Sequence, residues 1–197
     1  MGSTSSGGGE EFTRVDAGGG LTHAGIAWRN LQLGNGVVTR TFQAVGATLL
    51  TDQKCLDWLS KNASGGRGNR SQLEHNELVR NIVYSLGKAS ATGTAKLGVG
   101  AQQVTNTFVG SAPIVFLFNT SSAFFVRGPG HLFGSSPGIS GINAGTDRFR
   151  AAIALHEVAH LFRADGFKSN DGDEGTVSWN NDVLYDSCSK TINAASN

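Results

Sequence analysis

The chain has 197 residues, of which 39% are hydrophobic and 16% are charged, and its formal net charge is +1. This length is enough for one domain with a sizeable core. The low net charge argues against nucleic acid as a partner, and the lack of any apolar run of about 18–20 residues argues against a membrane-spanning helix.

The composition and the N-terminus bear on localisation. Glycine is abundant, at 28 residues, and the charged fraction is low, which fits extracellular bacterial proteins better than cytosolic ones. Residues 1–9 have neither the basic start nor the apolar stretch of a secretory signal. We expect residues 1–10 to form a flexible leader, and the protein to act outside the cell or at its surface.

Residues 25–42 predict a β-hairpin, because the pair Asn35-Gly36, which favours a tight turn, lies between apolar residues. We assign this hairpin to an N-terminal region, residues 11–50, that packs on or joins the main domain. Residues 51–197 are then expected to form that domain.

Two helices are expected next. An apolar stripe predicts a helix over about residues 52–62. Ser71 and Glu74 have the spacing of a capping box, so a second helix begins there and continues to a stop near Gly87. His75 lies in the first turn of this helix, and as a lone histidine it is expected to be solvated rather than catalytic.

A second hairpin is expected from residues 113–118 and 123–126, which flank a polar turn. Residues 90–112 are expected to form loops with one further strand. The order of hairpin, two helices, hairpin, one more helix and a short C-terminal segment favours an α+β fold over alternating β and α units.

The pattern His156-Glu157-x-x-His160 is the strongest functional signal in the chain. Residues four apart lie on one face of a helix about one turn apart, so both imidazoles can reach the same ion. Glu157 points beside that ion and can take a proton from a water molecule there. The pattern predicts a zinc site that supports hydrolysis.

The surrounding sequence favours a helix over residues 147–164. Three alanines are strong helix formers, and Thr146 or Asp147 can cap the first turn. Gly166 can adopt the left-handed conformation that ends a helix. We expect a small mixed or antiparallel sheet, or a hairpin, to pack beside this helix in a zincin-like arrangement.

Catalytic zinc usually takes three protein ligands, and no histidine follows His160. The third ligand is therefore expected among the carboxylates that follow the helix. A chain that folds back at Gly166 favours Asp171, and three alternatives stay open, namely Asp173, Glu174 and Asp182.

The chain resembles a bacterial family of extracellular zincin metallopeptidases over about residues 50–190. The resemblance rests on the pieces Leu155–Leu161, Ser178-x-Asn180-x-x-Val183 before Cys188, Cys55–Leu59, and the strand pair expected within Ile114–Val126. An aspartate after the HExxH pattern is the third ligand in that family, which supports Asp171. The loop is longer and more acidic here, so Asp173 competes with it.

The same family places one cysteine on an early helix and another near the end of the domain. The residues alone leave Cys55 and Cys188 open as either a disulfide or two buried thiols. The resemblance implies a Cys55–Cys188 disulfide. A second resemblance, to aspzincins of the deuterolysin type, rests on Gly175-Thr176 and Asp182, although the gap between these pieces differs.

We therefore predict a zinc-dependent peptidase that acts on peptides or proteins as a monomer, with Glu157 as general base. Candidates to stabilise the oxyanion are Tyr185, Arg163 and His131. Two alternatives are a secreted zinc-containing binding or structural module without turnover, and a toxin-like or processing domain fused to a larger surface protein.

Overall fold

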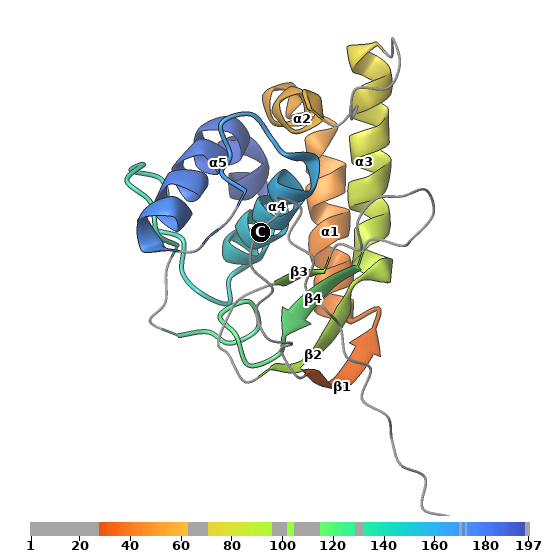
Figure 1. Ribbon diagram of the computed structural model, residues 1–197, viewed down its shortest axis with the longest axis vertical. Coiled ribbons are helices and arrows are strands. Elements are labelled where there is room, and N and C mark those ends of the chain that lie inside the picture. The colour runs from red at the N-terminus through yellow and green to blue at the C-terminus, as the bar shows by residue number, and fades with distance from the viewer. Residues whose placement is uncertain are drawn as a thin grey trace, which may run out of the picture.

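The computed structural model describes residues 28–62, 71–95, 102–104, 115–128, 132–169, 171 and 173–195. Within these residues the fold is helix-rich, and four short strands accompany five helices (Figure 1). In chain order the elements are β1 (Trp28–Leu33), α1 (Gly36–Leu49), α2 (Gln53–Ser60), α3 (Gln72–Ala89), β2 (Ala91–Ala95), β3 (Gln102–Val104), β4 (Val115–Asn119), α4 (Asp147–Phe162) and α5 (Glu174–Ala194). The expected leader, residues 1–10, lies outside the described residues.

The strands form one mixed sheet in the order β1-β2-β4-β3. The central pair, β2 and β4, is parallel, and both outer pairs are antiparallel. The sheet joins the helical part through β4, whose Phe116 and Phe118 pack against Phe42 of α1 at ring-centroid distances of 5.9 and 6.1 Å. These aromatic contacts place the sheet beside α1 and α3, below them in Figure 1.

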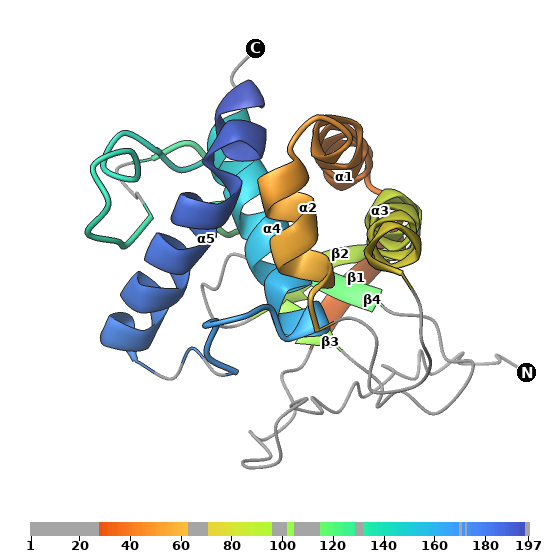
Figure 2. The same cartoon turned by 90° about the horizontal axis from the view of Figure 1, so that it is seen from above.

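Helix α4 lies in the middle of the helical part, between α5 and α2 (Figure 2), and it also packs on α1. Its side chains are buried around the whole helix rather than along one stripe, including Ala151, Ala154, Leu155 and Val158. A helix that is buried on every side needs small or apolar residues all round, and the alanines supply them. The HExxH pattern therefore lies on the most enclosed helix of the described fold.

Helix α5 contains a kink at Cys188, where φ and ψ are −123° and 17°. Cys188 is bonded to Cys55 of α2, which confirms the expected disulfide. The buried carboxylate of Asp52 serves both helices. It accepts a hydrogen bond from the Cys55 N–H at the start of α2, and others from the Thr191 N–H and hydroxyl just after the kink. One side chain thus caps two helix segments that are far apart in sequence.

The helices over residues 52–62 and from Ser71 onward are confirmed as α2 and α3, and the capping box at Ser71 and Glu74 is present. The hairpin over residues 25–42 is wrong. The Asn35 side chain accepts a hydrogen bond from the backbone N–H of Val37 and caps α1, so the Asn-Gly pair begins a helix instead of turning between strands.

The second hairpin is also wrong. Strand β4 is present, but residues 120–126 form turns, and the partners of β4 are β2 and β3. The expected short C-terminal segment is the long helix α5. His75 is buried rather than solvated. None of the described helices is both long enough and apolar enough to cross a membrane.

Candidate metal centre

Helix α4 sets the position of both histidines. Thr146 caps its first turn, as expected, by accepting a hydrogen bond from the Phe149 N–H. The helix ends earlier than expected, at Phe162, because Arg163 adopts the left-handed conformation with φ of 51°. Gly166, the expected stop, also has a positive φ, of 73°, and turns the chain further. These two turns direct the following segment back along the helix.

The segment that returns carries Asp171 to both histidines. Oδ2 of Asp171 lies 2.8 Å from Nε2 of His156 and 2.8 Å from Nε2 of His160. The three donor atoms lie within 4.8 Å of one another, so one metal ion could bind to all three. The residues expected as metal ligands therefore come together.

The donor set fits a zinc ion by its chemistry. Two imidazole nitrogens and one carboxylate oxygen are a common ligand set of catalytic zinc. Two of the three ligands are also held by a second residue. The Asn181 side-chain oxygen accepts a hydrogen bond from Nδ1 of His156 at 2.9 Å. Oδ1 of Asp171 accepts one from the Asn180 side-chain amide at 2.8 Å. Such outer contacts orient metal ligands in known sites.

The charges in the group are strongly coupled. Burial lowers the pKa of His156, but hydrogen bonding and the charge of Asp171, together with the charge of Glu157, outweigh burial and raise it overall. Burial raises the pKa of Asp171, yet its hydrogen bonds to both histidines hold that pKa far below its usual range. The carboxylate is therefore ionised and ready to bind a cation.

The group is enclosed on one side and accessible on the other. The side chain of His156 is 7% exposed, that of His160 is 11% exposed and that of Asp171 is 30% exposed. Glu157, which follows the first histidine, is buried at 8% exposure. An ion bound here would be reached from the side of Asp171 and His160.

Phe167 forms an aromatic wall beside both histidines. Its ring centroid lies 4.9 Å from that of His156 and 4.8 Å from that of His160, in edge-to-face arrangements. Trp58 of α2 also packs on Phe167, with the ring centroids 6.0 Å apart. Apolar residues around a metal site restrict water and limit the movement of the ligands.

Helix α2 holds the turn that follows α4. The Trp58 indole N–H donates to the Asp165 carbonyl at 2.8 Å, and the Asn62 side-chain amide donates to the Arg163 carbonyl at 2.9 Å. Lys61 forms an ion pair with Asp165 at 2.6 Å. Three side chains of one helix region thus fix the chain just before it returns to the histidines.

The other candidate carboxylates are outside the group of donors. Asp173 caps α5 through the Thr176 N–H and hydroxyl, and Glu174 is exposed in the first turn of that helix. Asp182 accepts hydrogen bonds from the backbone N–H groups of Ser135 and Ser136. Among these four carboxylates, Asp171 is the one that faces the histidines.

Two of the three candidates for the oxyanion role, Tyr185 and Arg163, lie among the described residues. The Tyr185 hydroxyl accepts a hydrogen bond from Asn193 and lies against Gly138. Arg163 is exposed at the end of α4. His131 lies outside the described residues.

Sequence reasoning did not identify Asn180 and Asn181 as site residues. Asn180 is one position of the family resemblance, without a role of its own there. A neutral amide is not among the usual zinc ligands, so it gives no spacing pattern to detect. The signal that the sequence does carry is an adjacent Asn-Asn pair in a segment that begins with the Asp173 helix cap.

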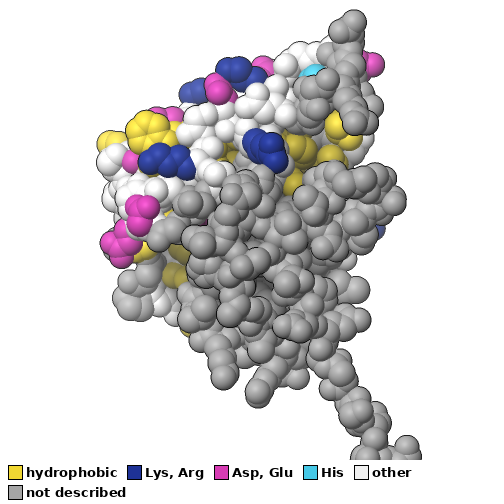
Figure 3. All heavy atoms as spheres, viewed as in Figure 1, with side chains coloured by type: hydrophobic (Ala, Val, Ile, Leu, Met, Phe, Trp, Pro, Cys, Tyr) yellow, Lys and Arg dark blue, Asp and Glu magenta, His cyan; other side chains and the backbone are white. Residues whose placement is uncertain are grey.

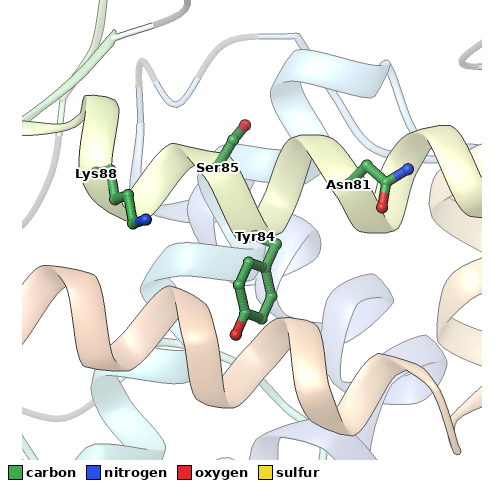
Figure 4. Close-up of a pocket in the computed structure, with 4 residues that line it drawn as sticks. All are labelled: Asn81, Tyr84, Ser85 and Lys88. Carbon is green, nitrogen blue, oxygen red and sulfur yellow. The ribbon is translucent and has the colours of Figure 1, made fainter.

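A surface pocket lies elsewhere, on α3. Asn81, Tyr84, Ser85 and Lys88 line it, and Tyr84 points from α3 toward α1 (Figure 4). The Tyr84 ring packs on Gly46 of α1. No histidine or carboxylate lines this pocket among the described residues.

On the face shown in Figure 3, the basic and acidic side chains of the described residues are interspersed, and they form no large patch of one charge sign.

Comparison with known proteins adds no relative: no protein-family model matches the chain, and no curated protein or solved structure matches it significantly. The candidate centre rests on the sequence pattern and on the geometry of His156, His160 and Asp171.

Proposed function

We propose that the protein is a zinc-dependent peptidase of zincin type. The observation that carries the proposal is that His156 and His160 both direct Nε2 to one oxygen of Asp171, with Glu157 buried on the same helix. A structural site would need neither the glutamate next to the first histidine nor an accessible side. The accessibility of Asp171 supports a site that a substrate can reach.

The donor set favours zinc among the common ions. Calcium and magnesium prefer all-oxygen sites, whereas two imidazoles with one carboxylate suit zinc. A zinc ion bound here would polarise a substrate carbonyl and bring the pKa of a bound water molecule toward neutrality. His156, His160 and Asp171 would hold that ion.

Glu157 supplies the proton transfer. It takes a proton from the water that attacks the scissile carbonyl carbon, and it passes this proton to the amine nitrogen as the C–N bond breaks. The products are a carboxylic acid and an amine, so water is consumed and no other reactant is needed. Glu157 directly follows His156 on α4 and is buried, which supports this role.

The substrate class that we propose is peptide or protein, and the place of action is outside the cell. The Cys55–Cys188 disulfide supports the second point, because disulfides persist in oxidising compartments. The disulfide also supports the resemblance to extracellular zincins. We propose a monomer with one zinc ion per chain.

The test compares the unaltered protein with the variant Glu157→Gln. We expect the unaltered protein to bind one zinc ion per chain and to cleave members of a peptide library, with cleavage sites read by mass spectrometry. Glu157→Gln should keep the zinc and lose at least about 100-fold in cleavage rate, because general-base catalysis contributes roughly that much.

Glu174→Gln is the matched control, since Glu174 is an exposed glutamate at the start of α5. This variant should cleave like the unaltered protein. Zinc bound without cleavage of any peptide by the unaltered protein would favour the zinc-containing binding module. Equal cleavage by Glu157→Gln and the unaltered protein would remove Glu157 from the mechanism.

A further inference from the structure

Two adjacent asparagines on α5, Asn180 and Asn181, are buried beside the metal centre at 0% and 4% exposure. A buried amide costs free energy unless its oxygen and nitrogen find hydrogen-bond partners. The oxygen and the nitrogen of Asn180, and the oxygen of Asn181, find theirs at the candidate ligands or in the chain that leads to them. Their burial is therefore tied to the centre rather than to the apolar core.

Asn181 determines which nitrogen of His156 can bind a metal. Its side-chain oxygen lies 2.9 Å from Nδ1 of His156, and an amide oxygen can only accept a hydrogen bond. Nδ1 must then carry a hydrogen atom, which leaves the lone pair of the neutral imidazole on Nε2. Nε2 is the atom that faces Asp171.

Asn180 determines which oxygen of Asp171 is available. Its side-chain amide donates to Oδ1 of Asp171 at 2.8 Å, so Oδ2 is left to face the two histidines. The same side chain bonds both the N–H and the carbonyl of Lys168, at 2.8 and 3.1 Å. Asn180 thus holds the returning chain at two points, three residues apart.

Adjacent residues on a helix point about 100° apart, so one helix can reach two different ligands with consecutive side chains. We propose that Asn180 and Asn181 are positioning residues of the zinc centre. Asn181 selects the tautomer of His156 that binds through Nε2, and Asn180 limits Asp171 to binding through Oδ2. This inference rests on the proposed zinc site and deepens it.

The test uses the full chain with its disulfide intact. Zinc affinity is measured by competition with a chromogenic chelator for the unaltered protein, Asn181→Leu, Asn181→Asp and Asn180→Leu. We expect each leucine variant to bind zinc about 10–100-fold more weakly, as is usual when an outer contact of a metal ligand is lost. Asn181→Asp keeps an oxygen acceptor and should retain most of the affinity.

Thr191→Val is the control for a general loss of stability. Thr191 is buried on the same helix and bonds Asp52, outside the metal centre. This variant should unfold at a lower temperature and yet bind zinc with unchanged affinity. Apo-protein unfolding curves for all variants separate a loss of fold from a loss of ligand orientation.

A second measurement needs no variant. Nitrogen-15 NMR of the zinc-loaded unaltered protein should show the His156 hydrogen on Nδ1, protected from exchange, and the metal on Nε2. A hydrogen on Nε2, or equal zinc affinity in the leucine variants, would overturn this inference and leave the zinc site standing. Failure of the unaltered protein to bind zinc would overturn the proposed function and this inference together.

Discussion

Oδ2 of Asp171 lies 2.8 Å from two imidazole nitrogens, so this one atom completes the candidate centre. Asp173, two residues later, performs a different task as the cap of α5. Their pKa values reflect this difference. That of Asp173 is lowered first by the backbone and hydroxyl of Thr176, whereas that of Asp171 is lowered by the histidines against the effect of burial. The hydrogen-bond partners of Asp171 and Asp173 therefore distinguish two aspartates of the same loop.

A pair of isosteric variants tests the assignment of the third ligand. Asp171→Asn should weaken zinc binding by roughly 100-fold or more, because a charged ligand is lost rather than an outer contact. Asp173→Asn should leave zinc affinity unchanged, since asparagine caps helices as well as aspartate does. Isothermal titration with zinc measures both. The variant His160→Ala supplies the reference for a site that lacks one ligand. If Asp173→Asn weakened zinc binding and Asp171→Asn did not, Asp173 would be the ligand.

At the scale of elements, the loop over residues 132–145 is attached to α5 by Asp182. The carboxylate accepts a bifurcated hydrogen bond from the Ser135 N–H at both of its oxygens, one from the Ser135 hydroxyl and one from the Ser136 N–H. Burial raises the pKa of Asp182, but these hydrogen bonds to Ser135 and Ser136 lower it overall. The folded protein therefore favours the ionised form more than the unfolded chain does.

This linkage predicts a pH-dependent effect of Asp182→Asn. The ionised side chain stabilises the fold fully above the unfolded pKa of about 4, and this stabilisation is lost as the pH falls through the lower folded value. The variant should be less stable by about 1 kcal/mol at pH 7, after allowance for solvent screening, and the difference should shrink below about pH 4. Urea unfolding of apo-protein at several pH values measures it.

Asp186→Asn is the matched control. Asp186 lies one turn further along α5 and bonds the Ser136 hydroxyl at the long distance of 3.4 Å. Its replacement should have a smaller effect on stability at pH 7. A stability difference for Asp182→Asn that stays constant down to pH 2 would contradict the attachment through an ionised carboxylate.

The errors of sequence reasoning have physical causes at this same scale. Asn35 can cap a helix or begin a turn with the same side chain, and the residues that decide between them pack against distant parts of the chain. Helix α5 was missed because several of its buried positions are polar, including Asn180, Asn181 and Thr191. The spacing of apolar residues cannot reveal a helix when many of its buried positions are polar side chains that form hydrogen bonds.

The local signals were more dependable. The HExxH pattern, the caps at Thr146 and Ser71, and the return of Asp171 depend on spacing within a short segment, and the structure agrees with each of them. The disulfide followed from a family resemblance and could not have been derived from spacing. The sheet order depends on pairing between distant strands, which no short segment specifies.

At the scale of the whole molecule, the Cys55–Cys188 bond closes a loop with a sequence separation of 133. A loop of this length restricts the unfolded chain by about 5 kcal/mol if the native bond is unstrained. The variant with both cysteines changed to alanine should lose a large share of this stability in urea unfolding at pH 7. Reduction should destabilise the unaltered protein and leave the double variant unchanged.

Thiol titration supplies the check on the bond itself. Denatured protein that has not been reduced should contain no reactive thiol, because no free cysteine remains in the chain. Two reactive thiols per chain would contradict the bond and weaken the proposed extracellular location. A zinc affinity that falls on reduction would show that the bond also supports the metal centre.

The disulfide at Cys188 limits how the length of α5 can change. Cys188 is fixed by its disulfide, and Asn181 lies seven residues earlier, which is close to two full helical turns, so both residues lie on nearly the same face. Inserting or deleting one residue between them would rotate Asn181 by about 100° and shift it by about 1.5 Å, away from His156. The number of residues between the two is therefore a constraint on the chain. Substitutions in that interval leave the rotation of the helix unchanged, whereas a change in its length breaks the contact with His156.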